Sequence, residues 1–316
     1  MKKIIYPSGQ KLTDMQKAYV NCFKDIIVKK QDAWTVLRYS DPKFLVFPDS
    51  WADIITADFD GILKMYDDYG KIILTADEIE EITRIFNYHS YIRKEGKISI
   101  TAANLIADFF MDSGHGIEIH TCFYCDMSYI NVYRHRVAGV VTNKRHFDLD
   151  HVIAQKVCPL FGMSLYNFVP SCKACNQGIK HTEELGKGDT RKLRLFSPSS
   201  SDFKVDKKVK VRARMRKHCK SGFLANRDNY SIRLQCNRTY KEYVRFFHLE
   251  DRYDYHKDEA LRLLDLKQRY SSKNIKQISQ LLKVSPDIVR EDIFGLEFAH
   301  DSHRCFEKLK RDIMGV

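Results

Sequence analysis

Four cysteines form two Cys-x-x-Cys pairs, Cys122/Cys125 and Cys172/Cys175, with 46 residues between the pairs. Four thiolates are enough for one tetrahedral zinc site, which then has no open position for a substrate. The total of nine cysteines is odd, which argues against a disulfide framework. We therefore expect one structural zinc ion. The pairs could also be coincidental, or one could be a redox dithiol, although no βαβ pattern of the usual kind surrounds them.

The segment between the pairs contains polar residues of the types that hydrolytic sites use. Asp150 and His151 lie near the end of the run Arg145–Val152, which predicts a strand. Asn167 follows sixteen residues after His151, and Asn176 comes directly after the second cysteine pair. This order resembles the HNH endonuclease family, in its subtype with a zinc-binding pair on either side of the motif. The match extends over about 60 residues.

The resemblance implies a central ββα-metal fold that hydrolyses phosphodiester bonds. His151 would be the general base, since a neutral imidazole titrates close to working pH. Asp150 and Asn176 would hold one catalytic Mg²⁺ or Mn²⁺ through oxygen ligands. Asn167 would brace the loop that orients His151, the zinc would keep the two halves of the motif in register, and Lys180 is a candidate phosphate contact.

The residues around the motif predict an α+β protein that is mostly helical. Composition divides the chain into a helical N-terminal region, 1–119, the nuclease motif with its zinc ligands, 120–185, and a mixed basic region, 186–316. Capping boxes at Thr13/Gln16 and Thr75/Glu78 predict two helix starts in the first region. In the last region we expect helices over Lys257–Tyr270, Asn274–Lys283 and from Ser285 to Gly295.

The net excess of positive charge lies in the later part of the chain. The whole sequence has 53 Lys and Arg against 41 Asp and Glu, a net charge of +12. Residues 1–120 have 15 basic and 18 acidic residues, a balance of −3, so residues 121–316 have a balance of +15. Such asymmetry favours a polyanionic partner, although a lysine-rich surface can also serve solubility alone.

Within this basic part, one segment alternates cations with apolar residues. Lys210, Arg212, Arg214 and Arg216 alternate with Val209, Val211, Ala213 and Met215. This period of two predicts a strand with its cations on one face, and Tyr230–Cys236 can pair with it. We expect the four cations to bind nucleic acid, the alternative being an ordinary solvated edge strand.

Together these features predict a metal-dependent HNH endonuclease that acts on DNA. Two alternatives remain, a non-catalytic zinc module that binds nucleic acid and an HNH enzyme that cleaves RNA. Short C-terminal patterns also resemble HNH nucleases of bacterial anti-phage defence systems, Septu-type or retron-associated, which work beside an ABC-type ATPase. If that resemblance holds, region 1–119 is the candidate docking surface for the ATPase.

No apolar run in the sequence approaches the ~18 residues that span a bilayer. The segment Met1–Gly9 resembles a signal peptide for three residues only, and Pro7 interrupts the apolar stretch that a signal needs. We therefore expect a cytoplasmic bacterial protein with no membrane partner.

Overall fold

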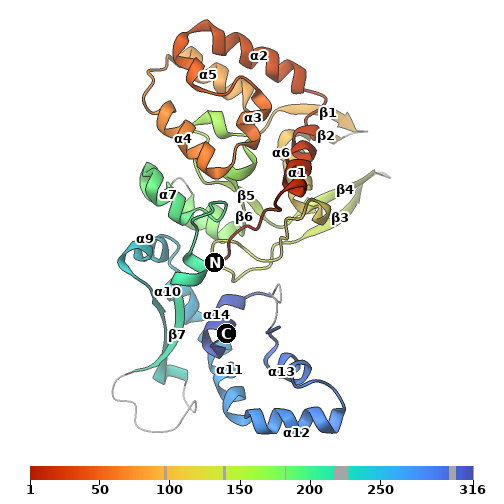
Figure 1. Cartoon of the computed structure of the whole chain (residues 1–316), viewed down its shortest axis with the longest axis vertical. Coiled ribbons are helices and arrows are strands. Elements are labelled where there is room, and N and C mark those ends of the chain that lie inside the picture. Colours follow the sequence, from red (N-terminus) through yellow and green to blue (C-terminus); the bar gives the residue numbers. More distant parts are fainter. Residues whose placement is uncertain (96–97, 138–139, 182, 217–226, 299–303, 316) are drawn as a thin grey trace. The chain divides into compact units, whose positions relative to one another are not determined.

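The computed structural model describes residues 1–95, 98–137, 140–181, 183–216, 227–298 and 304–315 (Figure 1). These residues form an α+β structure in which helices predominate, and the strands that they contain make small two-stranded antiparallel sheets. The prediction of a mostly helical α+β protein is confirmed.

The chain divides into two units. The N-terminal unit comprises Lys3–Ile119 and Ile130–Lys204, and the C-terminal unit comprises Met1–Lys2, His120–Tyr129 and Val205–Val316. The chain therefore leaves the N-terminal unit at His120, contributes residues 120–129 to the C-terminal unit, and returns to the N-terminal unit at Ile130. Whether the three regions distinguished by composition act as separate domains stays a prediction.

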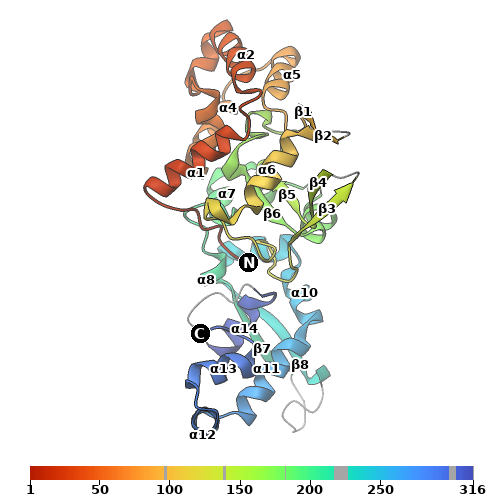
Figure 2. The same cartoon turned by 90° about the vertical axis from the view of Figure 1, so that its right-hand side faces the viewer.

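Helices make most of the N-terminal unit. They are α1 Gln10–Asn21, α2 Ile27–Ser40, α3 Trp51–Thr56, α4 Phe59–Tyr69, α5 Ala76–Ile85, α6 Ala102–Met111 and α7 Thr190–Phe196. In both views α2, α4 and α5 lie together (Figures 1 and 2). Buried aromatic rings fill the space between the helices, with Trp34 packed edge-on against Phe86 and Trp51 stacked on the same ring. Such aromatic packing contributes most to the burial of apolar surface.

The two predicted helix starts in this unit have different outcomes. The capping box is confirmed at α5, where the Glu78 amide donates to the Thr75 hydroxyl and the Glu78 carboxylate accepts from the Thr75 amide. The start at Thr13 is wrong, because α1 begins at Gln10. Gly9 precedes it with a φ of 59°, a left-handed conformation that glycine adopts without steric cost and that fixes the turn into the helix.

Three hairpins belong to the N-terminal unit: β1 Tyr91–Glu95 with β2 Ile98–Thr101, β3 Val132–Val137 with β4 Val140–Arg145, and β5 Asp148–His151 with β6 Phe168–Ser171. The strand expected over 145–152 is thus shorter than predicted. Arg145 pairs with Val132 in the β3–β4 ladder, and the chain bends at His146 and Phe147 before β5 begins.

Short helical turns connect these elements: Pro42–Val46, Ser113–His115, Pro159–Phe161, η4 Leu165–Asn167, Leu185–Gly188 and, in the other unit, Arg227–Asn229. After β6 the chain forms η5, Ala174–Lys180, which is a π-helix. The order β5, β6, η5 is therefore strand, strand, helix.

The C-terminal unit contains the predicted basic strand. Its elements are α8 Val205–Lys208, β7 Lys210–Met215, β8 Tyr230–Gln235, α9 Arg238–Phe246, α10 Leu249–Tyr255, α11 Lys257–Arg269, α12 Ser272–Leu282, α13 Pro286–Phe294 and α14 Glu307–Met314. The predicted pairing is confirmed, since β7 and β8 form an antiparallel ladder in which Val211 lies opposite Leu234. The three predicted C-terminal helices correspond to α11, α12 and α13.

Carboxylates from two helices hold the outer edges of the β7–β8 ladder. Asp312 of α14 accepts from the Val211 amide at 2.7 Å, and Glu250 and Asp254 of α10 accept from the Leu234 and Ile232 amides at 2.9 and 2.6 Å. These bonds satisfy edge amides that would otherwise be available to another strand. Among the helices that the structure describes, none combines the length and the apolar character that a membrane span requires.

Candidate metal centre and hydrolytic site

The first cysteine pair lies in a tight turn of the C-terminal unit. The Cys122 amide donates to the Ser128 carbonyl, the Asp126 amide donates to the Cys122 carbonyl, and the Met127 amide points at Cys125 Sγ at 3.4 Å. Asp126 has a φ of 59°, which closes the turn. The backbone therefore presents both thiols on the inside of this turn.

Buried polar contacts keep this turn in place. The Tyr253 hydroxyl donates to the Cys125 carbonyl at 2.8 Å, and the Tyr243 hydroxyl donates to the Tyr124 carbonyl at 3.1 Å. The fully buried Asp126 carboxylate accepts from the Thr121 hydroxyl and the Lys308 amide, both at 2.8 Å. Buried polar groups persist when they are bonded in this way, so α9, α10 and α14 all determine where the first pair lies.

The second pair begins directly after β6. The amides of Cys175 and Asn176 both donate to the Cys172 carbonyl, at 3.0 and 3.1 Å, so the chain turns at Cys172 and enters η5. Asn176 is consequently carried into the same helix as Cys175.

The two pairs form one cluster of buried cysteines. The four Sγ atoms of Cys122, Cys125, Cys172 and Cys175 all lie within 4.8 Å of one another. Zn–S bonds of ~2.3 Å in a tetrahedron place sulfurs about 3.8 Å apart, so little adjustment is needed. The prediction that the pairs come together is confirmed, and the cluster could bind a metal such as zinc. None of the eight cysteines that the structure describes forms a disulfide bond.

Asp148 and Asp150 share one face of β5, and this face is turned towards η5. Asn176 Nδ2 donates to Asp148 Oδ2 at 3.1 Å, and Lys180 Nζ lies 2.7 Å from Asp150 Oδ1. The Lys180 and Asp150 side chains are only 5% and 6% exposed. The strand and the helix are therefore joined by an amide–carboxylate contact and a buried ion pair.

Lys180 is the last residue of η5 and lies on the same side of this π-helix as Asn176. The His181 amide donates to the Asn176 carbonyl at 2.6 Å, a bond that spans five residues instead of four. Residues four apart are about one turn apart in an α-helix or a π-helix, so they lie close to the same side. Asn176 and Lys180 therefore point together at β5, and Lys180 Nζ, the expected phosphate contact, is bonded to Asp150 and to the His151 carbonyl.

His151 is the last residue of β5, and its ring is held on three sides. Nε2 lies 3.0 Å from the Gly162 carbonyl, and the ring packs against Tyr88 and Phe168 with centroid separations of 5.2 and 4.7 Å. A carbonyl only accepts, so the proton of the neutral ring is on Nε2 and Nδ1 keeps its lone pair. Burial lowers the pKa of His151, opposed by the Gly162 carbonyl and the Asp150 charge.

Gly162 is a site residue that the sequence analysis missed. A Cβ at this position would collide with the Phe86 carbonyl and lie 2.9 Å from Gln155 Nε2. Only glycine fits there, and its carbonyl is the group that fixes the tautomer of His151. No sequence signal identifies it, because a single glycine in a loop has many causes.

Asn167 braces the backbone that follows His151. It is fully buried, its Oδ1 accepts from the Ile153 amide at 2.9 Å, and its Nδ2 donates to the carbonyls of Ile153 and Phe161 at 3.0 and 3.1 Å. The Asn167 carbonyl accepts from the Val152 amide. The Asn167 side chain therefore links the segment that follows β5 to the segment that precedes β6.

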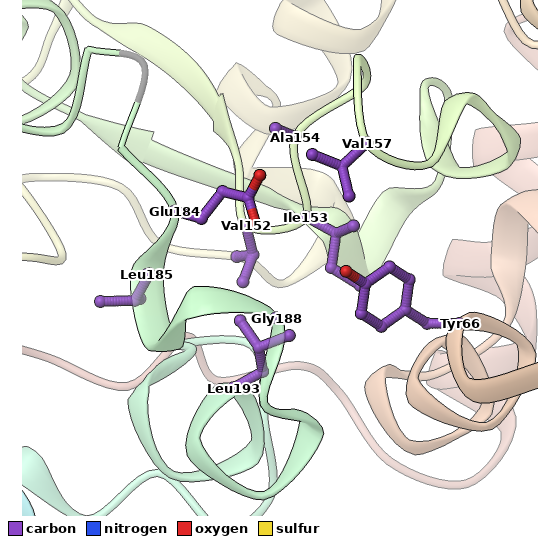
Figure 3. Close-up of a pocket in the computed structure, with 9 residues that line it drawn as sticks. All are labelled: Tyr66, Val152, Ile153, Ala154, Val157, Glu184, Leu185, Gly188 and Leu193. Atoms are coloured by element: carbon purple, nitrogen blue, oxygen red, sulfur yellow. The ribbon is translucent and has the colours of Figure 1, made fainter. Parts of the chain in front are cut away.

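A small pocket lies beyond this loop (Figure 3). Its lining is mostly apolar, with the Tyr66 hydroxyl and the Glu184 carboxylate as polar groups; the lining residues are Tyr66, Val152, Ile153, Ala154, Val157, Glu184, Leu185, Gly188 and Leu193. Burial and then the Glu184 charge raise the pKa of Tyr66. Neither Asp150 nor His151 lines this pocket, so it is separate from the candidate hydrolytic residues.

The oxygen donors suit a hard divalent cation, and each of the two predicted ligands also has a contact within the fold. Asp150 is paired with Lys180, and the Asn176 amide nitrogen with Asp148. Outside the cysteine cluster, the described residues contain no further group of three His, Cys, Asp or Glu side chains placed to hold a metal. A cation that binds Asp150 Oδ1 therefore competes with the Lys180 ammonium.

The four cations of the basic strand are in different surroundings. Lys210 Nζ lies 3.2 Å from Asp312 Oδ1, and an Arg212 guanidinium nitrogen donates to the Asp312 carbonyl at 3.2 Å. Arg214 and Arg216 are exposed. The strand therefore leaves its later cations open to solvent, while α14 contacts the earlier two.

No protein-family model, curated protein or solved structure matches this chain.

Proposed function

We propose that this chain is a metal-dependent HNH endonuclease that hydrolyses phosphodiester bonds of DNA. The observation that carries the proposal is the order and geometry of β5, β6 and η5. Asp150 and His151 end the first strand, Asn167 braces the loop, and Asn176 and Lys180 face the first strand from the helix. This is the strand–strand–helix order expected of a ββα-metal motif.

In this proposal His151 deprotonates the attacking water. Nε2 is bound by the Gly162 carbonyl, so Nδ1 is the nitrogen that takes the proton. The lowered pKa of His151 keeps the ring neutral near pH 7. Tyr88 and Phe168 restrict the ring to one orientation, and Asn167 keeps the following backbone in place.

Asp150 and Asn176 would hold a Mg²⁺ or Mn²⁺ ion through their oxygen atoms, with Asp148 orienting the Asn176 amide. When bound, such an ion would neutralise charge that develops on the scissile phosphate and the leaving oxygen. Lys180 holds Asp150 in position and releases it when a divalent cation binds. The expected products carry a 5′-phosphate and a 3′-hydroxyl.

We further propose a place in bacterial anti-phage defence, beside an ABC-type ATPase. The exposed face of α2 supports a docking role for the N-terminal region, because Val28, Val36 and Tyr39 are 70%, 73% and 64% exposed on one side of that helix. Apolar side chains grouped in this way mark interaction sites. We expect the isolated chain to cut weakly and the ATPase to increase cutting.

The test is nicking of supercoiled plasmid DNA, and cleavage of a single-stranded RNA, by the wild-type chain and by His151→Ala with Mg²⁺ or Mn²⁺. We expect nicking of DNA and a loss of ~10²-fold or more in the variant. His146→Gln is the matched control, since His146 is exposed and outside the site. Equal cutting by wild type and His151→Ala would reject the mechanism.

The non-catalytic zinc module gives a different result in the same assay. It predicts salt-dependent binding to DNA by both proteins and cleavage by neither, with or without an added ATPase. Cleavage of RNA but not DNA, lost in His151→Ala, would keep the mechanism and change the substrate.

A further inference from the structure

The α9 helix exposes a row of cations on the face opposite its core. Arg238, Lys241 and Arg245 are spaced at i, i+3 and i+7, which places them within about 60° around a helix of 3.6 residues per turn. All three are exposed, whereas Tyr240, Tyr243 and Val244 on the other face are buried. The apolar side of the helix is therefore buried, and its cations lie on the solvent side together with the half-buried Glu242.

These cations differ from three basic residues of the β7–β8 ladder that have partners among the described residues, and are exposed like Arg214 and Arg216. Lys210 and Arg212 contact Asp312, and Arg233 forms an ion pair with Glu250 at 2.8 Å. Within the described part of the chain, Arg238, Lys241 and Arg245 make no ion pair and no side-chain hydrogen bond. Like charges three or four residues apart repel each other in a helix, and the row has one acidic neighbour on the same side, Glu242, against its three cations.

From this we infer that the α9 row, Arg238, Lys241 and Arg245, binds the phosphate backbone of the nucleic acid substrate. The inference rests on the proposed function for the identity of the polyanion. A helix rises 1.5 Å per residue, so the row spans about 10 Å. One strand of duplex DNA has a phosphate every ~3.4 Å along the axis, so the row covers about three phosphates.

The surroundings of α9 favour nucleic acid over a membrane surface. A helix that lies on a membrane combines its basic residues with exposed apolar residues that enter the lipid. The apolar side of α9 is buried in the C-terminal unit, and none of its described residues is an exposed large hydrophobic side chain. In addition, α9 begins three residues after Gln235 ends β8, so the row continues a segment that already exposes Arg233.

The experiment measures binding of the full chain to a fluorescein-labelled 20-base-pair duplex by anisotropy, without added divalent cation, from 50 to 300 mM NaCl. The variant is Arg238→Gln/Lys241→Gln/Arg245→Gln, since glutamine keeps helix propensity and removes charge. The matched control is Lys273→Gln/Lys276→Gln/Lys283→Gln, which removes the same charge from exposed residues at α12 in the same unit.

We expect the α9 variant to lose affinity about tenfold or more at 100 mM NaCl, and its salt slope to fall by about 2.7, which is three phosphates at ~0.9 each. The control should stay within about twofold of wild type. Unchanged affinity and slope, an equal loss in the control, or no duplex binding by the wild-type chain would each overturn the inference. Binding to anionic vesicles that is lost in the α9 variant while duplex binding is kept would overturn it in favour of a membrane.

This outcome is separable from that of the proposed nuclease activity. Loss of duplex binding in the α9 variant, with no cleavage that depends on His151, would support the row and reject the nuclease. Cleavage that depends on His151, together with normal duplex binding by the α9 variant, would support the nuclease and reject the row.

Discussion

Cationic side chains occupy two contrasting environments in this protein. In the N-terminal unit, the Lys180 side chain is 5% exposed and its ammonium binds both the Asp150 carboxylate and the His151 carbonyl. In the C-terminal unit, Arg238 and Lys241 stand in solvent on α9 without an ion pair among the described residues. The buried lysine has its partners within the fold, whereas the exposed row has no ion-pair partner among the described residues and is open to another molecule.

The buried ion pair therefore contributes to the stability of the fold, whereas the exposed cations of α9 are available to bind a ligand. A buried polar group that loses its partner keeps the full cost of its desolvation, about 1–3 kcal/mol or more. An exposed cation that is removed changes stability by only ~0.5 kcal/mol or less. Substitutions in the buried network should therefore affect folding and metal binding, and substitutions in the α9 row should affect binding to DNA alone.

The largest effect is expected from the cysteine cluster. Cys172→Ser should lower the zinc content from about one ion per chain to nearly none, because a structural zinc site needs all four ligands and its binding energy of ~10 kcal/mol or more contributes to folding. Metal analysis and limited proteolysis measure both consequences. Cys236→Ser, which removes a half-buried thiol outside the cluster, is the control and should keep its metal. A full zinc content in Cys172→Ser would refute a four-cysteine site.

Asparagine side chains allow the same comparison between the two units. Asn167→Ala removes three hydrogen bonds from a fully buried position, so it should lower the free energy of unfolding by about 3 kcal/mol. Asn237→Ala removes a single helix cap, the bond from the Tyr240 amide at the start of α9, and should cost about 1 kcal/mol. Urea unfolding followed by circular dichroism measures both. If both variants lost the same free energy of unfolding, the buried contacts of Asn167 would stabilise the protein no more than the exposed helix cap at Asn237 does.

Some of this site could be predicted from sequence because its residue types are tied to short spacings. The two Cys-x-x-Cys pairs predicted a cluster that the structure contains, and the alternation of Lys210–Arg216 predicted a strand that pairs with Tyr230–Cys236. Local signals of this kind depend on a few neighbouring residues. The capping box at Thr75 succeeded for the same reason.

Other features depend on contacts that no local pattern encodes. The start of α1 is determined by the left-handed Gly9 and not by Thr13, and the partner of His151 is the carbonyl of Gly162, eleven residues away. Lys180 is held by the Asp150 carboxylate and the His151 carbonyl, about 30 residues earlier in the chain, and sequence spacing does not predict this contact. The sequence analysis did not select the α9 row. What distinguishes its three cations is that they make no ion pair among the described residues, and this can be seen only in a structure.

A third prediction concerns the competition between Lys180 and a divalent cation. Lys180→Met removes the ammonium from Asp150, so we expect Mn²⁺ to bind about tenfold more tightly, a change of ~1.4 kcal/mol. Electron paramagnetic resonance of free Mn²⁺ measures this without any cleavage. Lys173→Met removes an exposed charge next to Cys172 and should leave the Mn²⁺ affinity unchanged. Weaker or equal binding in Lys180→Met would mean that the ammonium does not occupy the cation position.

The smallest expected effect is a shift in the pH dependence of cleavage. Burial lowers the pKa of His151 below its usual value of 6.5, and the base is active only when the ring is neutral. Activity should therefore be complete above pH 6.5 and fall as the pH drops through the lowered pKa, with its midpoint below 6.5. Initial rates of plasmid nicking between pH 5 and 8 measure the midpoint, and duplex binding at each pH controls for loss of substrate affinity. A midpoint at or above 6.5 would mean that the buried environment of His151 is not retained during catalysis.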